Sequence, residues 1–219
     1  MTDFAQARKA MVDNQLRTSN VTDRRLLAAM GEVPREHFVP ASREAIAYID
    51  ETHPLHGAPG RFLPAPAPFA KLVQLAEIVH TDHVLDLAAG NGYSTDVLAH
   101  LAASVTAVEG DSSLVDAARK TLAGLGIVNA SVVAGSLEGG ATGKGPFDVI
   151  IIEVSIANVP EALFALLKPE GRLVALIAPP GQPAVAHIFA KSGKGIAARA
   201  EFNAVLPRLP AAKADEFVF

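Results

Sequence analysis

Two acidic residues and two glycines have the types and the spacing needed to hold a nucleotide-like cofactor. Asp86 lies near the carboxyl end of an apolar run, and Gly90 and Gly92 follow, where the lack of a side chain lets a ligand approach the backbone. Glu109 ends the next apolar run, 23 positions after Asp86, close to the roughly 20-residue offset at which an acid accepts hydrogen bonds from ribose hydroxyls. We expect the hollow beside this turn to be open to a ligand. The alternatives are a purely structural strand-to-helix turn and a solvated acid that opens a helix.

The elements around these residues alternate between strand and helix patterns. Val84 to Leu87 and Phe147 to Val154 are rich in apolar residues, as is typical of buried parallel strands. The alternation predicts an α/β fold, with a mainly parallel sheet covered by helices on both faces. Further strands are expected at 104–108, 131–134 and 171–177, and helices at 69–79, 94–101, 113–125 and 160–167. Two tail strands, near 187–191 and 197–206, are expected to form an antiparallel hairpin on the sheet edge.

The first 68 residues have a different pattern. Two helices are expected between Phe4 and Met30, with Thr22 and Asp23 as the cap between them. The segment 33–40 is bounded by two prolines and is predicted to be an extended or turn-like connector, followed by a short helix at 43–48. Residues 51–68 contain five prolines and two glycines, which predicts a long loop.

The composition excludes several classes of function. The chain has 219 residues, no cysteine and a net charge of −4, so thiol nucleophiles, disulfides and cysteine metal sites are excluded and no nucleic-acid surface is expected. Apolar residues make up 50% of the chain, which indicates a compact globule rather than disorder. The N-terminus lacks the apolar core of a signal peptide, and no apolar stretch of about 18 residues occurs. We therefore expect a cytoplasmic protein with no membrane partner, and its oligomeric state stays open.

His53 and His56 in the predicted loop have the His-x-x-His spacing of a metal-binding pair. No third ligand is apparent nearby, and histidines are common in surface loops. We therefore expect no metal site.

Stretches spread over most of the chain resemble landmarks of one family, the protein-L-isoaspartate O-methyltransferases, which use S-adenosylmethionine on a Rossmann-like fold. The N-terminal landmarks are more specific than a glycine turn, because generic methyltransferases do not share them. The matching stretches are Met11-Val12-x-x-Gln15-Leu16, Leu27-x-Ala29-Met30, Val33-Pro34-Arg35-Glu36-x-Phe38-Val39-Pro40, Ala47-Tyr48-x-Asp50, Val84-Leu85, Gly90-x-Gly92-Tyr93, Pro146-Phe147-Asp148 and Gly171-x-Leu173-Val174. The resemblance implies a Rossmann-like class I methyltransferase domain at 69–219, preceded by an N-terminal helical segment and substrate-side loop at 1–68.

The resemblance also implies a reaction and a site. A methyl group moves from the sulfonium of S-adenosylmethionine to the free carboxylate of an isoaspartyl residue in a protein or peptide, which starts the repair of that damage. The residues implied for the cofactor are Asp86, Ala88, Gly90, Asn91 and Gly92 at its amino-acid end, Glu109 at the ribose hydroxyls and Ser136 at the adenine amine. Because the acceptor is already an anion, the chemistry depends mainly on alignment and on the exclusion of water.

Three positions depart from the family pattern. Where the family has Gly-Gln-Thr-x-Ser-Gln-Pro, this chain has Gly60-Arg61-Phe62-Leu63-Pro64-Ala65-Pro66, so Phe62 and Pro64 replace the two hydroxyl residues. Ala88 replaces the first glycine of the turn, and Ser136 replaces an acid. Arg61 is a candidate to pair with the acceptor carboxylate, and a solvent-facing arginine is the alternative.

Glu153, at the end of the strongest predicted strand, is a candidate functional acid, with a helix-capping role as the alternative. Together with the departures, it leaves three functions open. These are methylation of isoaspartyl carboxylates, methylation of another acceptor on the same scaffold, and a catalytically inactive cofactor-binding or regulatory role. A nicotinamide dehydrogenase fits the glycine turn and Glu109, but the surrounding landmarks fit the methyltransferase pattern better.

Overall fold

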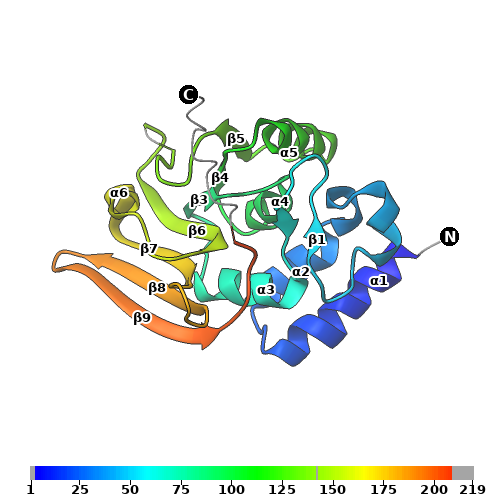
Figure 1. Ribbon diagram of the computed structural model, residues 1–219, viewed down its shortest axis with the longest axis horizontal. Coiled ribbons are helices and arrows are strands. Elements are labelled where there is room, and N and C mark those ends of the chain that lie inside the picture. The colour runs from blue at the N-terminus through cyan, green and yellow to red at the C-terminus, as the bar shows by residue number, and fades with distance from the viewer. Residues whose placement is uncertain (1–2, 142, 209–219) are drawn as a thin grey trace, which may run out of the picture.

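A seven-stranded sheet forms the centre of the molecule (Figure 1). The computed structural model describes residues 3–141 and 143–208. The strand order is β5-β4-β3-β6-β7-β8-β9. The strands are β3 (His83–Leu87), β4 (Ser104–Glu109), β5 (Ala130–Ala134), β6 (Phe147–Ile156), β7 (Leu167–Ile177), β8 (Val185–Ser192) and β9 (Gly195–Asn203).

The sheet is mainly parallel, as predicted. β3 pairs in parallel with β4 on one side and with β6 on the other. β5 pairs in parallel with β4, and β7 pairs in parallel with β6. From β3 the chain adds β4 and β5 on one side, and it then crosses back to add β6 and β7 on the other side of β3. The crevice beyond the carboxyl ends of the two strands at such a switch point is the usual ligand site. β8 is antiparallel to β7 and β9 is antiparallel to β8, so the predicted hairpin on the sheet edge is confirmed.

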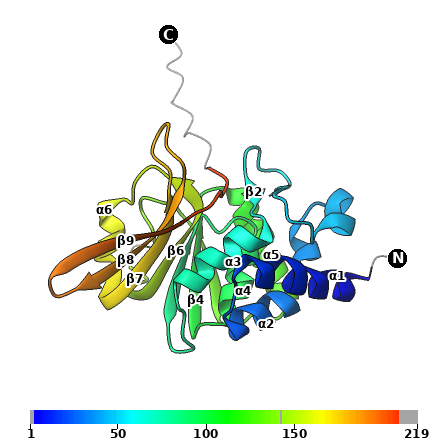
Figure 2. The ribbon, with the colours of Figure 1, turned by 90° about the horizontal axis from the view of Figure 1, so that it is seen from below.

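Hydrophobic clusters cover both faces of the sheet. One cluster joins Val84 and Ile151 to the helices α3 (Pro66–Leu75) and α4 (Tyr93–Ala99), and also includes Leu114 of α5 (Ser112–Gly124). The other joins Leu85 and Ile152 to the short helix α6 (Glu161–Ala165). Figure 2 shows α1 to α5 gathered toward one end of the molecule, and α6 near the β7–β9 end. Within the described ranges, no helix is long and apolar enough to cross a membrane.

The N-terminal segment packs onto the first of these faces. Its elements are α1 (Phe4–Met11), the π-helical η1 (Val12–Leu16), the 3₁₀ turn η2 (Arg17–Ser19) and α2 (Arg24–Glu32). Asp23 caps α2 by accepting hydrogen bonds from the backbone N–H groups of Arg25 and Leu26 at 2.8 and 3.3 Å, which confirms the predicted cap. Buried residues from both sides of position 68 belong to one hydrophobic cluster. The domain boundary at this position stays a prediction.

Two 3₁₀ turns follow α2, namely η3 (Arg35–Phe38) and η4 (Ala41–Ile46). They agree in kind with the predicted turn-like connector and short helix. Arg35 is completely buried, although nothing in the local pattern of 33–40 marks it as a core residue.

Residues 51–68 differ from the predicted long loop. β1 (His53–Pro54) pairs antiparallel with β2 (Phe62–Leu63), and we call residues 53–63 the β1–β2 hairpin. α3 begins at Pro66, inside the predicted loop. Prolines at 66 and 68 fall in the first turn of α3, where backbone N–H groups have no intrahelical acceptor, so proline is tolerated there.

Candidate active site

The glycine turn lies between β3 and α4, at the edge formed by the carboxyl ends of the parallel strands. Ala88, Gly90 and Gly92 have positive φ angles of 59°, 59° and 96°. Alanine is disfavoured in this conformation, and a hydrogen bond from the backbone N–H of Ala88 to the Val108 carbonyl (2.9 Å) holds it there. A Cβ on Gly92 would lie 3.1 Å from the Cβ of Ala118 in α5. The glycine therefore serves the packing of α5 as well as the turn.

Asp86 is buried beneath this turn. Its Oδ2 accepts hydrogen bonds from the hydroxyls of Ser94 and Thr95, each at 2.8 Å, and its Oδ1 has no hydrogen-bond partner within the described residues. Burial raises the pKa of Asp86 to about 6, the two hydroxyls oppose this shift, and the charge of Glu109 adds to it. Within the described residues, Asp86 thus keeps one unused acceptor atom near the carboxyl end of β3.

Glu109 ends β4, and its fully buried carboxylate faces the glycine turn. Its Oε1 accepts hydrogen bonds from Nη1 of Arg61 at 2.5 Å and from the backbone N–H of Asp111 at 3.0 Å. Its Oε2 accepts from Nη2 of Arg61 at 2.7 Å and from the backbone N–H of Gly90 at 2.8 Å. The arginine side chain is only 10% exposed, so its solvent-facing alternative is wrong.

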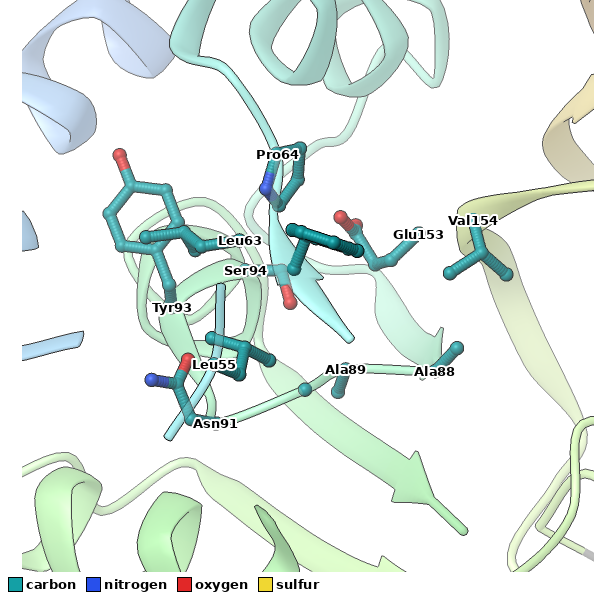
Figure 3. A pocket seen from close by; sticks show the side chains of 12 residues that line it. Leu55, Leu63, Pro64, Ala88, Ala89, Asn91, Tyr93, Ser94, Glu153 and Val154 are labelled. Atoms are coloured by element: carbon teal, nitrogen blue, oxygen red, sulfur yellow. The ribbon is translucent and has the colours of Figure 1, made fainter. Parts of the chain in front are cut away.

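The β1–β2 hairpin covers the hollow beside the turn. Figure 3 shows Leu55, Leu63 and Pro64 around the turn residues, and the cavity that they enclose has a volume of about 20 Å³. Such a cavity has room for about one water molecule. The prediction of an open hollow is therefore wrong for this conformation, because apolar side chains of the hairpin pack against the turn that the sequence pattern identified.

Glu153, toward the end of β6, lines the same cavity as Phe62 and Pro64. The residue is 5% exposed, and neither carboxylate oxygen has a hydrogen-bond partner among the described residues. Burial raises the pKa of Glu153 well above its usual value, and the nearby Asp86 raises it further. The side chain therefore lines the cavity as an acid that favours its neutral form, and it caps no helix.

Replacing Glu153 by glutamine is expected to stabilise the fold above neutral pH. The folded state holds the Glu153 proton more tightly than the unfolded state, so the stability contributed by the neutral acid is present at low pH and is lost as pH rises above about 4.5. Glutamine cannot lose that proton, and a gain of about 1 kcal/mol or more should develop with rising pH. Urea unfolding at pH 4.5, 7 and 8.5 measures this gain. A gain of equal size at all three values would contradict the account, and the exposed Glu44→Gln variant is the control.

Asn91 lies in the turn itself, and Ser136 lies in the loop that follows β5. Asn91 donates a hydrogen bond from its amide to the Phe38 carbonyl at 2.6 Å, which ties the turn to the N-terminal segment. Ser136 follows β5, is exposed, and accepts a hydrogen bond from the backbone N–H of Gly139 at 3.1 Å. The backbone N–H of Gly135 bonds to the Glu109 carbonyl, so this loop lies next to the end of β4.

The two loop histidines occupy different environments. His53 is completely buried, and its pKa is lowered to about 4 by burial and by the charges of Arg35 and Arg43, whereas His56 is exposed. No group of three or more potential metal ligands of the His, Cys, Asp or Glu types occurs in the described part of the chain.

Sequence reasoning missed several residues of this site. The hydroxyls of Ser94 and Thr95 donate hydrogen bonds to Asp86. Their position directly after the glycine turn could have identified them from the sequence. Leu55 was not identified, because nothing local indicates that a hairpin leucine packs on Gly90, where an added Cβ would lie 3.1 Å from its Cδ1. The ion pair between Arg61 and Glu109 joins residues 48 positions apart and has no local signature either.

The sheet, the glycine turn and the acid at the end of β4 define a Rossmann-like, class I methyltransferase. A solved structure titled protein-L-isoaspartate O-methyltransferase matches with a TM-score of 0.81, at 23% identity, over 93% of this chain and 66% of its own. A putative protein-L-isoaspartate O-methyltransferase from Plasmodium falciparum, in complex with S-adenosyl-L-homocysteine, matches with a TM-score of 0.76 at 22% identity, over 93% and 98%. These two likenesses show the fold.

Sequence comparison shows the family. The sequence model described as protein-L-isoaspartate(D-aspartate) O-methyltransferase matches residues 6–206. The chain is 36% identical to the protein-L-isoaspartate O-methyltransferase of Koribacter versatilis, over 89% of this chain and 86% of that protein. It is 38% identical to the Methylorubrum extorquens protein of the same name, over 82% and 77%. The chain belongs to the protein-L-isoaspartate O-methyltransferase family.

Proposed function

We propose that this chain transfers the methyl group of S-adenosylmethionine to the free carboxylate of isoaspartyl residues in proteins or peptides. The observation that carries the proposal is the family match over residues 6–206, which spans the N-terminal helices as well as the sheet. The relatives from Koribacter and Methylorubrum bear the name of this activity and are covered over most of their length. The product is a methyl ester whose formation starts the repair of the damaged residue.

The carboxyl edge of the sheet fits a ligand with positive charge. S-adenosylmethionine supplies a methyl group activated on a sulfonium, and it also carries an ammonium group. Among the described residues, Asp86 has one buried oxygen without a hydrogen-bond partner, and Glu153 has two. We assign Asp86 and the backbone of 88–92 to the amino-acid end of the cofactor, Glu109 to the ribose hydroxyls and Ser136 to the adenine amine.

Arg61 and Glu153 are our candidates on the acceptor side. Arg61 belongs to the hairpin that covers the turn, and Glu153 lines the cavity together with Phe62 of the same hairpin. A guanidinium pairs with a carboxylate through two parallel hydrogen bonds, and a neutral carboxylic acid donates one. Glu153 would orient the acceptor from the cavity that it lines, and Arg61 would do so only after its guanidinium leaves Glu109, while the hairpin excludes water. A general base is not needed, because the attacking carboxylate is already ionised.

Methyl transfer to an isoaspartyl peptide tests the proposal. We expect label from S-adenosylmethionine on the isoaspartyl peptide and none on the same peptide with ordinary aspartate. The label should be released by mild base, as a methyl ester requires. Binding of S-adenosylhomocysteine by calorimetry, with no label on the isoaspartyl peptide, would remove this acceptor and leave the cofactor assignment intact.

One observation favours a different acceptor as the second candidate. Phe62 and Pro64 line the cavity at the positions where the resemblance implies threonine and serine. Two hydrogen bonds to a charged group, at about 1.5 to 3 kcal/mol each, correspond to roughly 10² to 10⁴ in turnover. A substrate screen against small acids and cell extract would identify this acceptor. Isoaspartyl methylation that appears only after the double replacement Phe62→Thr with Pro64→Ser would instead favour a cofactor-binding protein that lacks catalysis. A cytoplasmic location and the lack of a nucleic-acid partner stay predictions.

A further inference from the structure

The acceptor capacity of Glu109 is completely used. A carboxylate has about four lone-pair positions, and four N–H donors fill those of Glu109: two from Arg61 at 2.5 and 2.7 Å, and the backbone donors of Gly90 and Asp111 at 2.8 and 3.0 Å. The backbone donors belong to the turn and to the strand end, so they stay in place. A ribose diol therefore gains hydrogen bonds to Glu109 only if the Arg61 guanidinium leaves.

We propose that Arg61 is an internal competitor of the cofactor, which holds the β1–β2 hairpin over the cofactor site until the ribose hydroxyls replace its guanidinium on Glu109. The inference depends on the ribose-binding role of Glu109 proposed above. It assigns Arg61 to the control of cofactor access, as an autoinhibitory contact of this chain.

Backbone hydrogen bonds link Arg61 to the rest of the hairpin. The backbone N–H of Leu55 donates to the Arg61 carbonyl at 2.9 Å, and the Arg61 N–H donates to the Ala58 carbonyl at 3.0 Å. Leu55 is the residue that packs on Gly90. Displacement of the Arg61 backbone therefore also draws the Leu55 side chain away from the turn, which enlarges a cavity of about 20 Å³ toward the several hundred Å³ that a cofactor needs.

The ends of the hairpin are anchored, and its tip contains two glycines. At one end Arg35 donates to the Pro64 carbonyl at 2.6 Å, and at the other His53 is completely buried. Gly57 and Gly60 at the tip have positive φ angles of 74° and 79°, and a Cβ on Gly57 would meet only the Ser113 hydroxyl, at 3.8 Å. In the described part of the chain, the Arg61 guanidinium ties the span between the anchors to this edge of the sheet through Glu109 and, at 3.2 Å, through the Ala88 carbonyl.

The charges favour an exchange of one cation for another. Glu109 is fully buried, so loss of Arg61 alone would leave a buried anion without a counter-charge. A cofactor that carries a sulfonium and an ammonium group restores positive charge at the same edge. The ion pair thus lowers the fraction of molecules in which the site is open to the cofactor. The apparent affinity falls in proportion to that fraction.

Calorimetric titration with S-adenosylhomocysteine tests the inference on the full chain. We expect Arg61→Ala to bind roughly 10-fold more tightly than the unchanged protein. Without the ion pair, a larger fraction of the molecules has the hairpin open and the cofactor site free. Arg61→Lys, which keeps the charge and loses the two-pronged geometry, should fall between the two. His56→Ala, an exposed change in the same hairpin, should leave affinity unchanged.

Hydrogen exchange without ligand gives an independent readout. The Leu55 amide should exchange several-fold faster in Arg61→Ala than in the unchanged protein or in His56→Ala, because its acceptor is the Arg61 carbonyl. Equal or weaker cofactor affinity in Arg61→Ala, while the unchanged protein binds, would overturn the inference and leave the proposed function standing. Failure of both proteins to bind would refute the cofactor assignment, and the inference with it.

Discussion

Replacement of Glu109 by alanine is expected to weaken the binding of S-adenosylhomocysteine by about 100-fold. Two hydrogen bonds from ribose hydroxyls to a charged acceptor are worth about 1.5 to 3 kcal/mol each. The same change also removes the ion pair that holds the hairpin over the cofactor site, which restores about tenfold of the lost affinity. Calorimetric titration measures the net effect.

The effect of Glu109 should depend on its partner in a defined way. Arg61→Ala tightens binding in the unchanged background, but it should have little effect when Glu109 is already alanine, because the two residues act through one ion pair. Asp116→Ala removes an acid that is 81% exposed on the neighbouring helix α5, and it should leave affinity within twofold. A loss of less than threefold in Glu109→Ala would mean that the ribose is held elsewhere.

Replacement of Arg35 by alanine is expected to destabilise the fold by about 3 to 5 kcal/mol. Arg35 donates to the buried carbonyls of Ala47 and Pro64 at 2.8 and 2.6 Å, and its guanidinium lies 4.8 Å from the centre of the Tyr93 ring. Alanine would leave both carbonyls without these donors and would open a cavity. The expected fall in Tm is roughly 10 °C for a chain of this size.

Thermal and urea unfolding of Arg35→Ala measure this loss. Arg17→Ala is the matched control, because Arg17 is 57% exposed and its ion pair with Asp13 lies on the surface. Such surface pairs contribute about 0 to 1 kcal/mol. A loss in Arg35→Ala no larger than that of the control would show that the buried arginine is dispensable for stability.

The central parallel strands were predictable from the sequence because they are rich in apolar residues. Val149 to Ile152 has no polar residue and must be covered on both faces, which places β6 inside the sheet before any coordinates are known. The turn at Gly90 and Gly92 was predictable because glycine adopts a positive φ without steric cost, and both residues do so here. The acid at the end of β4 then followed from spacing alone.

The covering of the site was not predictable, because it depends on contacts between distant segments. Pro64 and Pro66 looked like breaks in regular structure, yet Pro66 begins α3 and Pro64 accepts a hydrogen bond from a buried arginine. β1 and β2 have two residues each, too few to produce an alternating pattern. The partner of Arg61 is set by where the hairpin folds back, and charge alone does not determine it.

The outermost strand β9 affects the behaviour of the protein at high concentration. Most of its residues are exposed, and they include Arg199 and Glu201. A strand at the edge of a sheet offers unpaired backbone groups that a strand of a second molecule can join. An incoming strand would have to strip water from these charged side chains, which discourages aggregation through the sheet. Figure 1 shows β9 at the end of the molecule that lies away from the glycine turn, so this protection need not interfere with the site.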